Sequence, residues 1–379
     1  MRKNILLVGL ENASNYGDPI IYNCTKYLLS KENKNFIYNN LNLNPKINTI
    51  YTILNSISEK IGWNKFNSKL IINEYKRSFN NKIKKSDAII FAGGGLIKYK
   101  YQYFWSQISA IIDLASQYNI PVYFNAVGIE GYDEYDFKCQ HLKEQINKNC
   151  IRIITTRDDI QTLNNKYISN HNIKTFKVAD PAIFCSKIYN IQKKESNIIG
   201  IGLIRGKIFT DNGLKFSEKS LLNLYINLIN ELQSKKERFQ LFTNGVEEDL
   251  ELANRVCRYC KLDPNKDLVI PQNPQELIEI ISKYKCVIAT RLHACIISYS
   301  LNIPAIGLVW NNKLKMFGKC INYPERFLEI NDLTTDKIIK TLDKIKNEKY
   351  DSYYRIEYEF SQKQSIIEIV KDINSKVSV

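Results

Sequence analysis

Two arginines stand at points in the chain where charged side chains could do chemistry. Arg157 follows the apolar run 151–156, and Arg291 follows the run 286–290, so each comes just after a predicted strand. A guanidinium is a rigid planar fork that matches the oxygens of a carboxylate or phosphate. Two such groups at one site suit a substrate that carries two anionic groups.

His293 is one of only three histidines in 379 residues, and it lies two positions after Arg291. On an extended backbone, side chains two residues apart leave the same face. Histidine titrates near neutral pH, which suits a general acid or a phosphate ligand. The alternative is a histidine at a helix N-terminus that bonds to the backbone. For Arg157 the alternative is an ion pair with Asp158 or Asp159.

Further candidates for substrate binding also follow predicted strands. They are Asn15 and Gly17 after the first strand, the triplet Gly93, Gly94 and Gly95 after the run 88–92, and Asn244 after the run 239–243. Glycines allow a backbone to approach a ligand closely. The triplet has neither the lysine of a phosphate-binding P-loop nor the spacing G-x-G-x-x-G, so a dinucleotide cofactor is not expected.

Several carboxylates have a simpler role as well as a chemical one. Asp18 could accept a proton from a substrate hydroxyl, but capping the helix that begins there is the simpler role. Asp180, before Pro181, is ambiguous in the same way. Glu247, Glu248 and Asp249 are expected to stabilise a helix start through the helix dipole.

An aromatic stretch follows the glycine triplet. It contains Tyr99, Tyr101, Tyr103 and Trp105, interleaved with Lys98 and Lys100. Aromatic faces with neighbouring amines suit sugar stacking or phosphate contact. The start of an amphipathic helix explains the same pattern equally well.

Short apolar runs alternate with helical patterns along most of the chain, which predicts parallel sheets covered by helices on both faces. A polar linker near 185–196 separates two such series. We therefore expect an α/β fold of two Rossmann-like domains, 1–185 and 196–350, with their parallel sheets facing a cleft. Residues 351–379 are expected to form a helix that packs back on the first domain. Ligands of such sheets bind beyond the carboxyl ends of the strands.

The charge balance, 54 basic against 39 acidic side chains, gives a net charge of +15 that favours anionic partners. The lysines are scattered and no arginine-rich arm is present, so no nucleic-acid partner is expected. Nine cysteines without framework spacing suggest reduced thiols. Cys257 and Cys260 form one C-x-x-C without a second pair, so no metal is predicted.

Membrane insertion is also disfavoured by the sequence. The apolar run in the first ten residues is too short for a signal peptide, and no run of 18 apolar residues occurs. We expect a cytoplasmic protein, with docking on the inner face of the cell membrane as the second option.

Taken together, these residues resemble the polysaccharide pyruvyl transferase family. The resemblance runs from Asn15 to Phe317. Its motifs are Asn15-Tyr16-Gly17-Asp18, Gly93 to Gly95, Arg157-Asp158, Asp180-Pro181, and Arg291-Leu292-His293 followed by Pro304, Trp310, Lys313 and Phe317. Trp310 stands where the family more usually has tyrosine. The order and spacing of the motifs carry the resemblance, since each motif alone is weak.

The resemblance implies a fold like the GT-B glycosyltransferases, with residues 1–185 on the acceptor side and 196–350 on the donor side. It implies phosphoenolpyruvate as co-substrate, no cofactor, and a ketal-linked pyruvate formed across two sugar hydroxyls. The acceptor would be a polysaccharide or a lipid-linked repeat unit, such as an undecaprenyl-linked oligosaccharide. Such chemistry belongs to bacterial exopolysaccharide or capsule biosynthesis in the cell envelope.

The resemblance also suggests roles for the residues. His293 would act as general acid or assist the departure of phosphate, and Arg157 and Arg291 would hold the two anionic ends. Asp18 is the candidate base. Leu292, Trp310 and Lys313 complete the expected substrate contacts.

Two other functions fit parts of the same pattern. A glycosyltransferase could use a nucleotide sugar on the same fold, with Glu247 or Asp249 as the carboxylate for the ribose. A non-catalytic basic protein could dock on anionic lipid or polymer, and Arg291 and His293 would then be packing residues.

Overall fold

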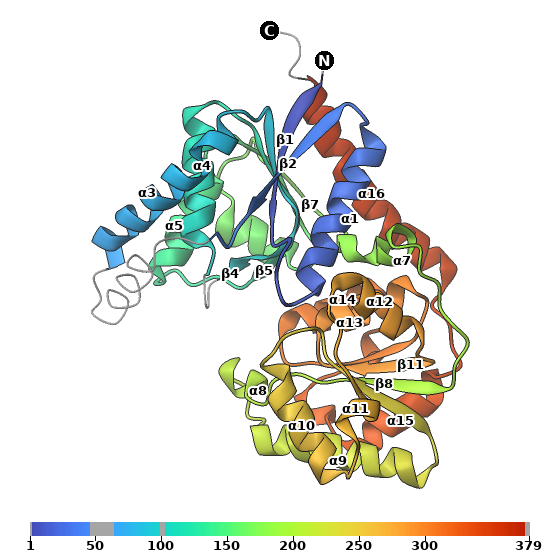
Figure 1. The fold of residues 1–379 in the computed structure, drawn as a ribbon. Coiled ribbons are helices and arrows are strands. Elements are labelled where there is room, and N and C mark those ends of the chain that lie inside the picture. Colours follow the sequence, from blue (N-terminus) through green and yellow to red (C-terminus); the bar gives the residue numbers. More distant parts are fainter. Residues whose placement is uncertain (1, 46–63, 99–102, 376–379) are drawn as a thin grey trace. The chain divides into compact units, whose positions relative to one another are not determined.

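The computed structural model describes residues 2–45, 64–98 and 103–375, and it divides into two compact units (Figure 1). Unit 1 comprises Met1–Asn12, Ile21–Asp180 and Ser361–Val379. Unit 2 comprises Ala13–Ile20 and Pro181–Phe360. The fold is α/β, and each unit is built on its own parallel sheet.

Unit 1 has a seven-stranded sheet in its described residues, in the order β2-β1-β3-β5-β6-β7, with β4 paired to β5. The strands are β1 (Lys3–Gly9), β2 (Phe36–Asn42), β3 (Ala88–Phe91), β4 (Gly94–Lys98), β5 (Val122–Glu130), β6 (Ile151–Thr156) and β7 (Lys174–Lys177). All paired strands run parallel, with Ile5 opposite Ala88 and Ile89 opposite Val122. Every residue of β3 is buried, as expected for a strand covered on both faces.

Helices cover both faces of this sheet (Figure 1). They are α1 (Gly17–Glu32), α3 (Asn64–Ile83), α4 (Trp105–Gln117), α5 (Phe137–Ile146), the short α6 (Ile160–Thr162) and α16 (Ser352–Ser375). A π-helical turn, Leu163–Tyr167, continues α6. Helices α3, α4 and α5 lie on one side of the sheet, and α1 and α16 on the other.

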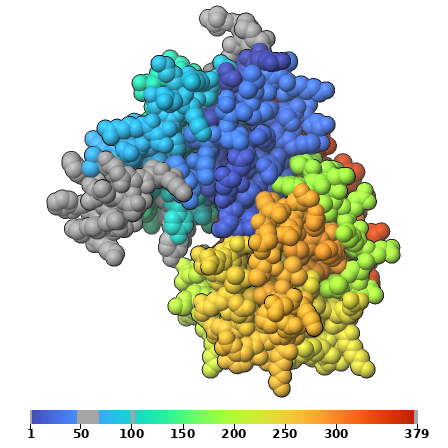
Figure 2. Space-filling view, in the orientation of Figure 1, coloured from blue at the N-terminus to red at the C-terminus, as the bar shows by residue number. Residues whose placement is uncertain are grey.

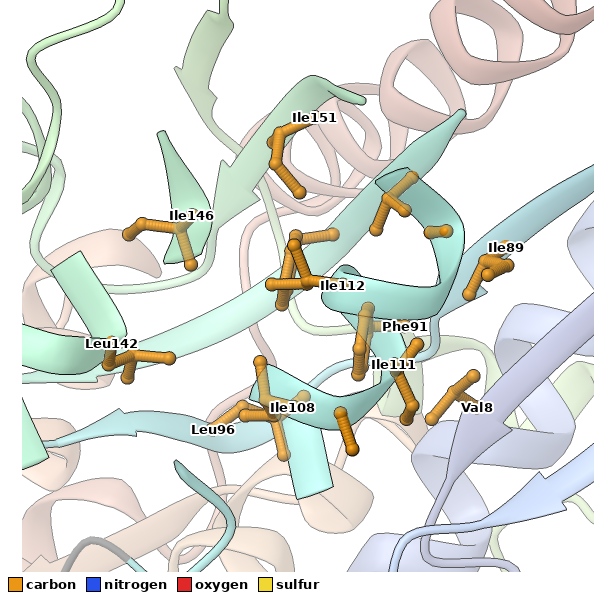
Figure 3. Packing of buried hydrophobic residues seen from close by; sticks show 14 of the residues in the cluster. Val8, Ile89, Phe91, Leu96, Ile108, Ile111, Ile112, Leu142, Ile146 and Ile151 are labelled. Carbon is orange, nitrogen blue, oxygen red and sulfur yellow. The ribbon is translucent and has the colours of Figure 1, made fainter. Parts of the chain in front are cut away.

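The core of unit 1 forms where α4 faces the sheet (Figure 3). Ile108, Ile111 and Ile112 recur at helical spacing and are fully buried. They pack towards Phe91 of β3, and Leu142 lies beside them on α5. The apolar face of α4 therefore fixes the helix against the centre of the sheet.

A buried polar network fastens α16 to the other side of the sheet. The side-chain oxygen of Asn125, in β5, accepts hydrogen bonds from Gln362 (3.0 Å) and Ser365 (2.7 Å). The Ser365 and Thr155 hydroxyls are 3.0 Å apart, and the Thr155 hydroxyl accepts the amide N–H of Ala126 at 2.8 Å. The C-terminal part of α16 is thus an integral layer of unit 1.

Unit 2 has a six-stranded parallel sheet in the order β10-β9-β8-β11-β12-β13. The strands are β8 (Ile198–Gly202), β9 (Arg238–Phe242), β10 (Leu268–Val269), β11 (Cys286–Ala289), β12 (Ala305–Leu308) and β13 (Phe327–Leu328). The helices are α7 (Cys185–Ile188), α8 (Ile208–Asp211), α9 (Glu218–Ser234), α10 (Asp249–Tyr259), α11 (Pro264–Asp267), α12 (Pro274–Ser282), α13 (Leu292–Ser300), α14 (Asn312–Cys320) and α15 (Thr335–Ile345). In the space-filling view, residues near 270–320 form a continuous orange surface on this unit (Figure 2).

The observed units differ from the predicted boundaries in three places, and one of them is that unit 2 extends to Phe360 rather than to 350. The middle segment of unit 1 ends at Asp180 rather than at 185, and the stretch predicted as a linker belongs to unit 2. Of this stretch only Cys185 is buried, and residues 186–196 are half-buried or exposed, as a polar linker would be. Residues 13–20 also belong to unit 2, although they directly follow a strand of unit 1.

Candidate active site

Sequence-predicted residues gather at the point in unit 2 where the strand order reverses. Strand β8 lies in the middle of the sheet and pairs with both β9 and β11. Arg205 follows β8, Asn244 and Asp249 follow β9, and Arg291 follows β11. The carboxyl ends of strands at such a point form the usual ligand site of an open α/β sheet.

Arg291 is held by a carboxylate from the neighbouring loop. Its Nε and Nη2 atoms donate to Asp249 at 3.0 and 2.6 Å, and the Asp249 side chain is 0% exposed. The amide N–H of Arg205 donates to the same carboxylate at 2.9 Å. Burial raises the pKa of Asp249, and Arg291 and the Arg205 amide oppose that rise. The Arg291 side chain keeps 16% exposure, which leaves its Nη1 edge for another partner.

The residue before Arg291 is fixed by a second set of contacts. The indole N–H of Trp310 donates to the Thr290 carbonyl at 2.7 Å, and the Thr290 and Tyr225 hydroxyls are 2.6 Å apart. Burial raises the pKa of the Tyr225 hydroxyl. Trp310, expected to contact substrate, therefore also orients the end of β11.

His293 is buried in the first turn of α13 and packs against the backbone of Gly17. A Cβ atom at Gly17 would overlap the His293 imidazole. Glycine is thus required at this position so that the ring can approach the start of α1. This contact gives the Asn-x-Gly-Asp motif a physical reason that the sequence alone did not reveal.

The segment 13–20 is joined to the loop after β9. The Tyr16 amide donates to the Asn244 carbonyl at 3.2 Å. Gly245 has φ = +91°, and a Cβ there would meet the Tyr16 ring and, at 2.8 Å, the Ser14 carbonyl. The loop therefore needs glycine both for its backbone conformation and for close packing.

Asp18 lies inside the first turn of α1, which begins at Gly17, so the expectation that Asp18 caps this helix is wrong. Its carboxylate accepts the side-chain amide of Asn15 at 3.1 Å. Leu292 is the first residue of α13 and is half-buried, as is Lys313 near the start of α14.

The remaining candidates lie in unit 1. Arg157 forms an ion pair with Asp180, and the two side chains are only 5% and 2% exposed. Asp158 accepts the Ile129 amide at 2.7 Å, and burial raises the pKa of its carboxyl. Asp159 caps α6 by accepting the Thr162 amide at 2.9 Å.

The glycine triplet also serves packing in unit 1. Gly93 and Gly94 have φ values of +102° and +92°. A Cβ at Gly93 would lie 2.9 Å from the Ile21 side chain. The triplet does not form a separate turn after β3, because Gly94 is the first residue of β4.

Part of the aromatic stretch lies outside the described residues, namely Tyr99, Lys100 and Tyr101. Among the others, Tyr103 is exposed and Trp105 is buried in the core of unit 1. The Lys98 ammonium lies 3.5 Å from the Glu130 carboxylate and 5.8 Å from the centre of the Tyr103 ring. Trp105 is therefore a packing residue, as the helix interpretation expected.

Nine of the candidates lie in unit 2 and four lie in unit 1. Those in unit 2 are Asn15, Gly17, Asp18, Asn244, Arg291, Leu292, His293, Trp310 and Lys313, and those in unit 1 are Gly93, Gly94, Gly95 and Arg157. Asp249 was assigned only to a helix start, although it binds Arg291 directly. Its position seven residues after β9 was the available signal.

Metal and membrane features are few in the described part of the chain. No group of three or more potential metal-ligating residues occurs within residues 2–45, 64–98 and 103–375. Cys257 and Cys260 are buried free thiols, and burial raises the pKa of Cys257 to about 11. Over the same residues, no helix has the length and apolar character that a membrane crossing requires.

Two parallel-sheet units with charged groups at the strand ends define a protein of the GT-B fold class, and solved structures with this fold are similar. UDP-GlcNAc 2-epimerase from Methanocaldococcus jannaschii has a TM-score of 0.62 at 13% identity, over 99% of this chain and 100% of that one. The S. aureus MnaA–UDP co-structure has a TM-score of 0.63 at 10% identity, over 100% and 98%. The Neisseria meningitidis UDP-GlcNAc 2-epimerase bound to UDP-GlcNAc has a TM-score of 0.58 at 12% identity, over 98% and 100%. At such low identity the likeness establishes the fold only.

The chain belongs to the polysaccharide pyruvyl transferase family, whose sequence model matches residues 15–312. The match begins at Asn15 and includes Arg157, Arg291 and His293. No curated protein matches the sequence. The family makes the protein a transferase that acts on a sugar.

Proposed function

We propose that the protein transfers pyruvate from phosphoenolpyruvate to two hydroxyls of one sugar. Protonation of the methylene carbon would leave an oxocarbenium-like centre at C2. One hydroxyl adds there and loses its proton. Phosphate then leaves as its C–O bond to C2 breaks, and the second hydroxyl adds to C2 and loses its proton, which completes the ketal. The observation that carries the proposal is a braced Arg291 two residues before His293, in a chain of the pyruvyl transferase family.

The donor contacts are proposed from the charges available. Arg291 would bind one anionic group of phosphoenolpyruvate through its Nη1 edge, because its other edge is held by Asp249. Lys313 would add a second positive charge in the same unit. Arg157 of unit 1, whose Nη1 group pairs with Asp180, is kept as a separate candidate for an anionic group of the substrate.

The proton transfers are assigned to His293 and Asp18. His293 would protonate the methylene carbon or assist the departure of phosphate, and its buried contact with Gly17 restricts the ring. Asp18, which is held by Asn15, is the proposed base for a sugar hydroxyl. Replacing His293 with Ala should reduce turnover by about 10²-fold or more while the fold is kept. Near-normal turnover would remove His293 from the mechanism.

The protein is proposed to work in the cytoplasm without a cofactor, with peripheral contact at the inner face of the cell membrane if its acceptor is lipid-linked. The net charge of +15 would attract both an anionic donor and an anionic lipid surface. The acceptor would be a sugar of a cell-envelope polysaccharide or of an undecaprenyl-linked oligosaccharide, in a bacterial cell.

A nucleotide-sugar glycosyltransferase is the second candidate, because the similar solved structures include one bound to UDP-GlcNAc. Such an enzyme needs a carboxylate for the ribose. Asp249 is already engaged with Arg291, and Glu247 is exposed, so neither is a prepared ribose ligand. The third candidate, a non-catalytic docking protein, would make the braced arginine a packing feature only.

The deciding experiment is a thermal-shift titration with phosphoenolpyruvate, UDP-sugars and GDP-sugars. At 100 times its dissociation constant a ligand should stabilise the protein by about 2.7 kcal/mol. We expect a shift with phosphoenolpyruvate that disappears in Arg291→Ala. It should persist in Arg255→Ala, which removes a half-buried arginine of the same unit that pairs with Glu218. A shift with a nucleotide sugar alone would favour the glycosyltransferase.

A further inference from the structure

Asn244 is a buried residue whose side chain has no hydrogen-bond partner in the described part of the chain. It is 0% exposed and lies two positions after the end of β9. Neither Oδ1 nor Nδ2 has a hydrogen-bond partner among the described residues. An unpaired buried polar group costs about 1–3 kcal/mol, and folded proteins contain few of them. An amide with both ends unsatisfied therefore calls for a functional reason.

Asn125 in unit 1 is a buried asparagine with a structural role, and its hydrogen bonds can be compared with those of Asn244. It is equally buried, but Gln362 and Ser365 donate to its oxygen, and its Nδ2 lies 3.4 Å from the Thr25 hydroxyl. Both ends of that amide are thus occupied by protein groups. The contrast indicates that Asn244 is kept for a group outside the protein.

A second unsatisfied oxygen lies on the adjoining segment. The Oδ1 atom of Asn15 is buried and has no partner within the described residues, while its Nδ2 donates to Asp18. The Tyr16 amide, next to Asn15, bonds the Asn244 carbonyl. The site thus offers two amide oxygens that need a donor and one amide nitrogen that needs an acceptor.

This combination discriminates between the two proposed substrates. Phosphoenolpyruvate at neutral pH carries a carboxylate and a phosphate, which almost only accept hydrogen bonds. It can satisfy Nδ2 but neither amide oxygen. A sugar hydroxyl both donates and accepts, so it can satisfy both ends of Asn244.

We propose that Asn244, assisted by Asn15, binds a hydroxyl of the acceptor sugar, so that unit 2 contacts the acceptor as well as the donor. This inference rests on the proposed function. It places the hydroxyl beside Asn15, whose amide also holds Asp18, the proposed base. Because Asn244 is 0% exposed, the residues that cover it must shift before a sugar can reach it.

The test compares Asn244→Leu with Asn125→Leu. Leucine has a similar size and forms no hydrogen bonds. Asn125→Leu should lower Tm because it leaves Gln362 and Ser365 without their acceptor. Asn244→Leu should keep or raise Tm. Asn15→Ala, at a half-buried position, is the second variant if Asn244→Leu fails to fold.

Binding is measured by ligand-observed NMR with p-nitrophenyl glycosides of glucose, galactose, mannose and N-acetylmannosamine, on protein saturated with phosphoenolpyruvate. We expect at least one glycoside to bind wild type, and its Kd to rise about 10-fold or more in Asn244→Leu, as for one lost hydrogen bond. The thermal shift with phosphoenolpyruvate should remain unchanged in the variant.

Three outcomes overturn the inference. They are no glycoside binding to wild type, equal glycoside binding in wild type and Asn244→Leu, or loss of the phosphoenolpyruvate shift in Asn244→Leu. The second outcome would mean that Asn244 binds only an internal water. Failure of the proposed function is distinguished from these, because wild type would then show no shift with phosphoenolpyruvate at all.

Discussion

The two arginines that follow strands β6 and β11 occupy equivalent places in their sheets but are enclosed to different degrees. Arg157 and its partner Asp180 are 5% and 2% exposed, and both lie in unit 1. Arg291 is 16% exposed and is braced on one edge by a fully buried Asp249. The difference teaches that the same motif can mainly hold a sheet end together in one unit and present a charged edge to a ligand in the other.

The largest expected effect is on the stability of unit 1. Arg157→Ala should lower the free energy of unfolding by about 3–5 kcal/mol, because the buried Asp180 carboxylate would lose its arginine partner. Arg152→Ala, which removes a pair with Asp372 whose arginine is 36% exposed, should cost about 1 kcal/mol or less. The loss of unfolding free energy in Arg291→Ala should lie between these two values. Denaturant unfolding measures all three, and equal values would break the comparison.

The next effect concerns the contact that orients His293 in unit 2. Gly17→Ala should reduce turnover by about 10²-fold, because the added Cβ displaces the imidazole from its place. The assay is phosphate release from phosphoenolpyruvate with a glycoside acceptor. Gly213→Ala is the control, since nothing lies within 4 Å of a Cβ there. It should lose some stability, because φ is +80°, but not turnover.

A smaller effect tests whether Asp249 positions Arg291. Asp249→Asn keeps the shape but removes the charge that holds the guanidinium, and the Kd for phosphoenolpyruvate should rise about 10-fold, or about 1.4 kcal/mol. Isothermal titration measures this. Asp343→Asn, on α15 in an exposed pair with Lys235, should leave the Kd unchanged. Tighter binding in Asp249→Asn would show instead that Asp249 competes with the ligand.

The smallest effect concerns the pH dependence of stability and involves His141, on α5 of unit 1. Burial lowers the pKa of His141 from its ordinary value of 6.5. The unfolded chain therefore binds a proton at this residue more readily than the folded chain does. The stability contribution is complete above pH 6.5 and is lost as the pH falls below it.

His141→Gln should flatten the fall of Tm between pH 7 and pH 5, because glutamine does not take up a proton in this range. Turnover at pH 7 should not change. An unchanged slope would mean that other groups carry the acid sensitivity of unit 1.

Most strands and helices could be predicted because their signals are local. Continuous apolar runs became β1, β3, β5, β8, β9, β11 and β12. The sequence also predicts a helix around Pro274 to Ser282, and α12 has these bounds. Helix starts were less accurate. The sequence predicts a helix that starts at Asp158, but α6 starts at Ile160 after the cap Asp159. It predicts another that starts at Glu247, but α10 starts at Asp249. Several acidic residues precede each start, and only the folded backbone selects which one bonds to it.

The positions of the strands in the sequence were enough to predict part of the candidate site. Residues after parallel strands must collect at one edge of a sheet, so Arg291, His293 and Asn244 could be selected without a structure. The residue that pairs with Arg291 could not be selected from the sequence. Asp249 looks like an ordinary first-turn carboxylate, and its contact with Arg291 spans 42 positions in the chain.

The local sequence was therefore enough for the α/β class, the two series of strands and the strand-end residues, because hydrophobic periodicity and turn chemistry act over a few neighbouring residues. Only the tertiary structure assigned residues 13–20 to unit 2, set Gly17 against His293, and left the Asn244 amide unsatisfied while it enclosed that of Asn125. Those outcomes depend on which distant side chains meet, and that is decided by the packing of the whole unit.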